Sequence, residues 1–116
     1  MIDSSGSVSD AQLDAFANEI SHIHKQKVPI RVVIFDCKVS DSYEFTGKFK
    51  PITGRGGTDF RPPFEEIEKF RDISAVVCLT DGEGPFPTTP KLQTLWILTR
   101  DGNKDVPFGR TITIDV

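Results

Sequence analysis

Short oxygen-bearing side chains gather in three separate segments, "DSSGS", "GRGGT" and "TDG". These segments offer two carboxylates and several hydroxyls, and neither histidine nor cysteine: Asp3, Ser5, Ser7, Thr58, Thr80 and Asp81. Hard oxygen donors of limited total charge suit Mg²⁺ or Mn²⁺, whose octahedral shells also retain water. Alternate side chains of an extended loop point the same way, so the Asp-x-Ser-x-Ser spacing presents three oxygens together. The residue types therefore indicate a site for a hard divalent cation.

A helix cap is the competing interpretation of the first segment. Ser and Asp are common at helix starts, where their side chains accept hydrogen bonds from free backbone N–H groups. However, Ser9 and Gln12 fit a capping box, and Val8 can pack on Leu13 as a hydrophobic staple. Because Ser9 already supplies the cap, the three oxygens of "DSSGS" remain available for a metal.

Helices and apolar strands alternate along the chain. Residues 9–25 and 58–70 place apolar side chains at three-and-four spacing, which predicts two helices, the second with two prolines in its first turn. The runs "IRVVIF", "ISAVVCLT" and "LQTLWILT" are continuously apolar, as in strands buried on both faces. "DSYEFTGKFK" predicts a short edge strand and "RTITIDV" a last strand, with Ile112, Ile114 and Val116 on one side. This alternation predicts an α/β fold with a mostly parallel, Rossmann-like sheet, whose ligands bind beyond the carboxyl ends of the strands.

In this order, "DSSGS", "GGTD" and "TDG" resemble the metal-ion-dependent adhesion site (MIDAS) of von Willebrand factor A (VWA) domains, and the resemblance spans the whole chain. It implies metal ligands from three loops: Asp3, Ser5, Ser7, Thr58 and Asp81. In that family some carboxylate contacts run through water, and a sixth position stays open for an acidic side chain of a partner. Within the family, the chain is most similar to a bacterial VWA-like domain at the C-terminus of predicted metallopeptidase-type proteins, which ends much like "LWILT…PFGRTITIDV".

Two departures from the VWA pattern shape our expectations. The late helices are missing, since proline-rich and polar loops stand in their place, so the fold is a reduced one. The first strand should be the central one, yet only Met1 and Ile2 precede Asp3. We therefore expect residues 1–116 to be a single VWA-like domain and the C-terminal fragment of a longer protein. Unpaired strand edges in mid-sheet favour association, so we expect a homodimer of the isolated domain.

The resemblance implies a Mg²⁺- or Mn²⁺-dependent protein–protein interaction module rather than an enzyme. Its partner would offer an Asp or Glu, and would be an AAA-type ATPase or another domain of the parent protein, which itself could carry a metallopeptidase-like domain upstream. The alternatives are a metal-dependent hydrolase of phosphate esters and a structural domain with a vestigial site. Against a hydrolase, the three segments contain no histidine to act as general base and no lysine to balance phosphate charge. "GRGGT" also lacks the Gly-Lys-Ser/Thr ending of a nucleotide-binding loop.

Composition excludes several other classes of function. A net charge of −3 argues against nucleic acid and acidic membranes as partners. No apolar run approaches the roughly 18 residues of a membrane helix, and we expect a cytoplasmic bacterial protein.

His22 and His24 point apart on a helix, so they cannot share a metal, and we expect both at the surface. Cys37 and Cys78 are predicted to be buried reduced thiols, and Trp96 a core residue.

Overall fold

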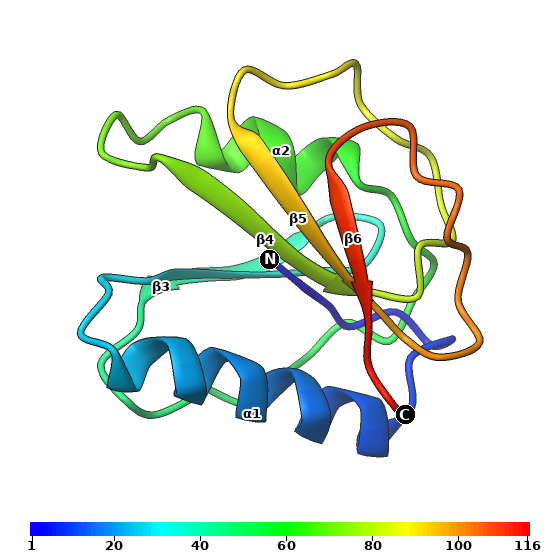
Figure 1. Cartoon of the computed structure of the whole chain (residues 1–116), viewed down its shortest axis with the longest axis horizontal. Helices are drawn as coiled ribbons and strands as arrows, with labels where there is room; N and C mark the ends of the chain where they lie inside the picture. The colour runs from blue at the N-terminus through cyan, green and yellow to red at the C-terminus, as the bar shows by residue number, and fades with distance from the viewer.

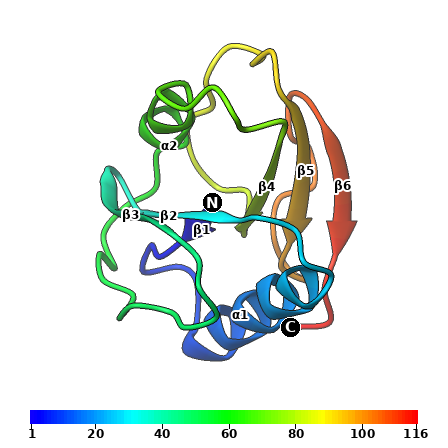
Figure 2. The ribbon, with the colours of Figure 1, turned by 90° about the vertical axis from the view of Figure 1, so that its left-hand side faces the viewer.

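The chain forms one six-stranded sheet with a helix on each face. The computed structural model describes all of residues 1–116, and the strands follow the order β3-β2-β1-β4-β5-β6 (Figures 1 and 2). The elements are β1 (Ile2–Asp3), α1 (Asp10–Lys25), β2 (Arg31–Phe35), β3 (Val39–Glu44), α2 (Arg61–Ile67), β4 (Ala75–Thr80), β5 (Gln93–Leu98) and β6 (Arg110–Thr113). Only β3 runs antiparallel to its neighbour. The predicted α/β fold with a mostly parallel sheet is confirmed.

The start of α1 follows the predicted capping box. The Ser9 hydroxyl accepts a hydrogen bond from the Gln12 backbone N–H at 3.1 Å, and the Gln12 side chain accepts one from the Ser9 N–H at 2.9 Å. Val8 and Leu13 belong to the same buried cluster, as a hydrophobic staple requires. The helix therefore has its own cap, and "DSSGS" is not needed for that purpose.

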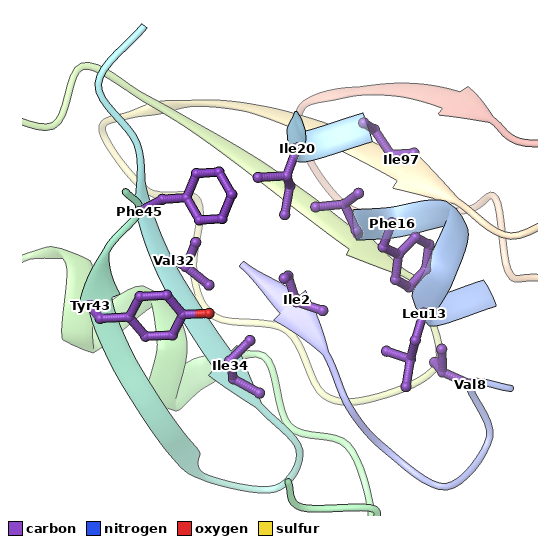
Figure 3. Close-up of a cluster of buried hydrophobic side chains, with 11 residues drawn as sticks. Ile2, Val8, Leu13, Phe16, Ile20, Val32, Ile34, Tyr43, Phe45 and Ile97 are labelled. Carbon is purple, nitrogen blue, oxygen red and sulfur yellow. The ribbon is translucent and has the colours of Figure 1, made fainter. Parts of the chain in front are cut away.

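Two apolar clusters lie on the two sides of the sheet. The first fills the space between α1 and the sheet and includes Ile2 and Phe16 (Figure 3). The second lies under α2 and centres on Trp96, which is fully buried and donates its indole N–H to the Phe108 carbonyl at 2.8 Å. Phe86 contacts Trp96 edge-on from the proline-rich loop. Aromatic side chains on loops thus cover this face of the sheet, where late helices were expected to be missing.

Several element boundaries differ from the prediction. The second helix is confined to Arg61–Ile67, because the segment before it is tied to other loops through its backbone. The edge strand runs from Val39 to Glu44, earlier than the predicted 41–50, because its polar residues pair with β2 across a bulge. The last strand ends at Thr113, and Ile112 is 49% exposed on this outer edge, although Ile114 does pack against the α1-side cluster.

Two side chains depart from the expected burial. Cys37 is exposed, because β2 ends at Phe35 and the chain turns before reaching it, so its prediction as a core thiol was wrong. Cys78 is buried as predicted. His22 is at the surface, whereas His24 is half-buried with its ring edge-on to Phe45. Neither helix has the length and apolar character needed to cross a bilayer.

Candidate functional site

The carboxyl ends of the parallel strands converge at one edge of the sheet, the lower right of Figure 1, where α1 also begins. Asp3 ends β1 there and is fully buried. Its carboxylate accepts hydrogen bonds from the Ser5 backbone N–H, at 2.9 Å, and from the Thr80 hydroxyl. The Ser5 and Ser7 hydroxyl oxygens lie 3.2 Å apart. The Ser4 hydroxyl points the other way, to the Phe35 carbonyl at 3.0 Å, so alternate residues do share a side.

The Asp3 carboxylate has no cationic partner. The three ion pairs of the molecule join other residues: Arg55 with Asp10, Arg61 with Asp59, and Lys69 with Glu66. Burial raises the pKa of Asp3, the hydrogen bonds from Ser5 and Thr80 oppose that rise, and the negative charge of Asp81 adds to it. A buried carboxylate in this setting is costly unless a cation balances it.

Asp81 lies on the loop that follows β4. It is buried, and its side chain accepts a hydrogen bond from the Glu83 N–H at 3.1 Å. The backbone carbonyl of Asp81 accepts a hydrogen bond from the Asn103 N–H at 2.8 Å, which ties the Asp81 loop to the loop that follows β5. Gly82 has a φ of 74°, and a side chain there would collide with the Asn103 carbonyl. These constraints hold the Asp81 loop in one conformation.

Backbone hydrogen bonds join the glycine-rich loop to the first loop. The Arg55 N–H donates to the Ser4 carbonyl, and the Gly6 N–H donates to the Gly56 carbonyl, both at 2.9 Å. Thr58 is half-buried, and its side chain lies against Gly84 in the Asp81 loop, where an added Cβ would come within 3.0 Å of it. The three motif segments are therefore neighbours, although they are far apart in the sequence.

The structure gathers the five predicted ligands to different degrees. Hydrogen bonds link the first-loop residues directly, and Asp81 is close enough for its charge to act on Asp3. The Thr58 hydroxyl forms no hydrogen bond with the other four side chains and reaches them only through its loop contacts. No three His, Cys, Asp or Glu side chains come together anywhere in the molecule. The site is thus built of two carboxylates and hydroxyls, and this all-oxygen donor set fits a hard divalent cation.

Two residues support the site without being among its five predicted ligands. Thr80 uses its hydroxyl to bind the Asp3 carboxylate and also accepts the Gly82 N–H at 3.1 Å. Asp36 accepts hydrogen bonds from the N–H groups of Lys38 and Gly56, both at 3.1 Å, and so holds the glycine-rich loop. Asp36 comes directly after a buried strand, as Asp81 does, and that position was the available signal.

Comparisons with known proteins agree with this architecture. A family model described as "VWA-like domain (DUF2201)" matches residues 1–115. An uncharacterized protein of Thermotoga maritima is 28% identical over 109 residues, which cover 90% of this chain and 27% of that protein. The chain thus spans about a quarter of the length of this relative. No solved structure matches the chain.

Proposed function

Because the chain belongs to the VWA-like domain family, we propose that it is a protein-interaction module whose contact with a partner depends on a bound divalent cation. Family membership by itself suggests an interaction or regulatory module, which agrees with the resemblance seen in the motifs. The finer proposal is that Mg²⁺ or Mn²⁺ binds among side chains of the three loops: Asp3, Ser5, Ser7, Thr58 and Asp81. A bound cation would supply a positive centre to which an acidic side chain of the partner can coordinate.

The observation that carries this proposal is the setting of Asp3. A fully buried carboxylate with no ion pair, in the field of Asp81, is an unfavourable arrangement for the protein alone. Ser5 and Thr80 orient the carboxylate through their hydrogen bonds, and the Ser5 and Ser7 hydroxyls stand together beside it. A cation held by these oxygens would remove the electrostatic cost and make the loops a single rigid unit.

The proposed partner is a protein that presents an Asp or Glu, such as an AAA-type ATPase or another domain of a longer parent protein. The relative that matches this chain is much longer than the matched region, which supports an arrangement with further domains. We propose no catalytic role for the site. The site lies where α1 begins, whereas both histidines lie in the last two turns of this helix. His22 is about 18 Å along the helix axis from Asp10, the first residue of α1, at a rise of 1.5 Å per residue. Neither histidine is therefore placed to act as a general base at the site.

Calorimetric titration of the chain with Mg²⁺ tests the proposed metal site. We expect one bound ion per chain in the wild type and a loss of affinity of at least tenfold in Asp81→Ala. Asp14→Ala is the matched control, because Asp14 is an exposed acid on α1, and it should bind as the wild type does. Equal affinity in all three proteins would place the metal elsewhere and overturn the proposal.

The role of the bound metal is tested with a carboxylate probe. A peptide with one central Glu should bind in Mg²⁺ and be released by a chelator, while the same peptide with Gln should not bind. Hydrolysis of p-nitrophenyl phosphate that disappears in Asp81→Ala would instead identify a hydrolase. Binding of the Glu peptide with unchanged affinity in the presence of chelator would also contradict the proposal.

A further inference from the structure

Arg55 is the only basic residue in the three motif segments "DSSGS", "GRGGT" and "TDG", and the proposed metal site does not use it. It lies between Gly54 and Gly56, and its own φ is 60°, in the left-handed region that favours glycine. Lys27, the other non-glycine residue with a positive φ, directly follows the C-cap of α1, where this conformation is common. Arg55 follows no helix, so the chain carries a large side chain at a position where glycine would cost less free energy.

The backbone of Arg55 is fixed against the first loop. Its N–H donates to the Ser4 carbonyl at 2.9 Å, and a Cβ added at Gly6 would lie 3.1 Å from the Arg55 carbonyl oxygen. The side chain then extends along that loop, because its Nη2 donates to the Val8 carbonyl at 2.7 Å. Val8 directly follows Ser7, so the guanidinium lies beside a proposed metal ligand.

The guanidinium has hydrogen-bonding capacity that the protein leaves unused. An arginine carries five N–H donors, and the Val8 carbonyl takes one of them. The Asp10 carboxylate lies 3.9 Å from Nη2, beyond hydrogen-bond distance, and is 98% exposed, so this ion pair is weak. The Arg55 side chain is itself 40% exposed, and Gly6 and Ser7 are exposed as well. A partner that reaches a bound cation would therefore also meet this guanidinium.

Support of the first loop does not account for these features. A bond to the Val8 carbonyl needs a single donor, which a lysine also supplies, and it needs no exposed planar group. The guanidinium suits a carboxylate, because two parallel N–H groups match its two oxygens. Neither Asp3 nor Asp81 forms an ion pair with Arg55. The matching carboxylate is therefore expected from outside the chain.

We propose that Arg55 binds a second acidic side chain of the partner, next to the Asp or Glu that coordinates the cation. This inference rests on the proposed function and narrows the partner to a segment with two acids. Since the guanidinium is bound at Val8, one residue beyond Ser7, a second acid reaches it more directly than the remaining oxygen of the coordinating carboxylate. Acids at positions i and i+2 of an extended segment fit this arrangement, because their side chains point the same way about 7 Å apart.

Two peptides and one substitution form a double-mutant cycle that tests this contact. One peptide contains Glu-Gly-Glu and the other Glu-Gly-Gln, and Arg55→Gln removes the positive charge. In saturating Mg²⁺ the wild type should bind Glu-Gly-Glu at least fivefold more tightly than Glu-Gly-Gln. Arg55→Gln should bind the two peptides within about twofold, which is the statistical advantage of a second Glu. Arg71→Gln is the matched control and should discriminate as the wild type does, because Arg71 is exposed and precedes the amino end of β4, away from the site.

Two further measurements separate a partner contact from support of the loop. The Mg²⁺ affinity of Arg55→Gln without peptide, measured by calorimetry, should differ from that of the wild type by less than threefold. In nuclear magnetic resonance spectra of the wild type, the Arg55 Nε–H signal should shift on addition of Glu-Gly-Glu and stay in place with Glu-Gly-Gln.

Equal weakening of both peptides in Arg55→Gln would overturn the proposal, because the residue would then hold the loop or meet the coordinating carboxylate itself. A preference for Glu-Gly-Glu well above twofold that persists in Arg55→Gln would overturn it as well. In both cases, Mg²⁺-dependent binding of Glu-Gly-Gln to the wild type would leave the proposed function standing. If the wild type binds neither peptide in Mg²⁺, the proposed function fails and this inference fails with it.

Discussion

Replacing Asp3 with Asn should stabilise the protein without metal and remove its response to metal. Asn has nearly the same shape, and its side-chain oxygen can still accept the Ser5 N–H. Its amide group can donate to the Thr80 hydroxyl, which can reorient its proton. The hydrogen bonds at this position are therefore retained in Asp3→Asn, while the buried negative charge is lost.

The size of both effects follows from the burial of Asp3 and from ligand linkage. Replacing buried ionic groups by neutral ones of similar volume is often neutral or stabilises proteins by roughly 1–4 kcal/mol, and we take about 1–2 kcal/mol here because hydrogen bonds already offset part of the cost of the Asp3 charge. With about 2.1 cal/mol/K of unfolding entropy per residue, a chain of 116 residues shifts its Tm by about 4 °C per kcal/mol. Asp3→Asn should therefore melt about 4–8 °C above the wild type in chelator. Mg²⁺ at one hundred times its Kd adds about 2.7 kcal/mol, or about 11 °C, to the wild type alone.

The assay is thermal unfolding by circular dichroism for the wild type, Asp3→Asn and the exposed control Asp14→Asn. Each protein is melted in chelator and in saturating Mg²⁺ at constant ionic strength. The order of stability of wild type and Asp3→Asn should reverse between the two conditions, and the control should follow the wild type. If Asp3→Asn melts below the wild type in chelator, Asp3 serves the fold itself and the reasoning fails.

Three further predictions follow from other contacts. Asp36→Ala should weaken Mg²⁺ binding severalfold in calorimetry and lower the free energy of unfolding in urea by about 1–2 kcal/mol, because the Gly56 N–H loses its acceptor. Asp36→Asn should recover part of the lost affinity and part of the lost stability. Trp96→Ala should cost about 3–5 kcal/mol in urea unfolding, since the ring is fully buried among aromatic side chains, and a loss below about 1 kcal/mol would contradict this packing. Cys37 should react with a thiol reagent in the native protein and Cys78 only after unfolding, because burial raises the pKa of Cys78; equal reaction rates would show that the core opens readily.

The central part of the fold was predictable because its signals are local and strong. Continuous apolar runs identified β2, β4 and β5, and the capping box placed the start of α1 within one residue. The edge strands were harder, because β3 is held by pairing with β2 and β6 by pairing with β5 rather than by burial. Exposure on such edges follows from the position of a strand in the sheet, which a local pattern does not contain. Cys37 was misjudged for the same reason, since its burial depends on where β2 turns.

The same difference between local and long-range signals explains which parts of the candidate site could be predicted from the sequence. The spacing of Asp3, Ser5 and Ser7 is local, so their hydrogen-bonded arrangement could be anticipated from an extended loop. The position of Thr58 depends on contacts between the glycine-rich loop and two other loops, and no pattern of nearby residues encodes those contacts. Asp36 was overlooked, and Thr80 was counted among the oxygen-bearing side chains but not among the five ligands, because both residues act by holding other residues.

Compensation of charge distinguishes Asp3, a proposed metal ligand, from Asp36, which holds the glycine-rich loop, although both carboxylates lie at the ends of neighbouring strands. Burial alone would raise the pKa of Asp36, but backbone N–H donors, including those of Lys38 and Gly56, outweigh it and lower the pKa. Its negative charge is therefore satisfied within the protein. Asp3 is also buried and hydrogen-bonded, yet its pKa is raised, because its donors do not offset burial and Asp81 repels it. The protein satisfies the charge of Asp36 by itself and leaves that of Asp3 uncompensated, so a cation is expected at Asp3.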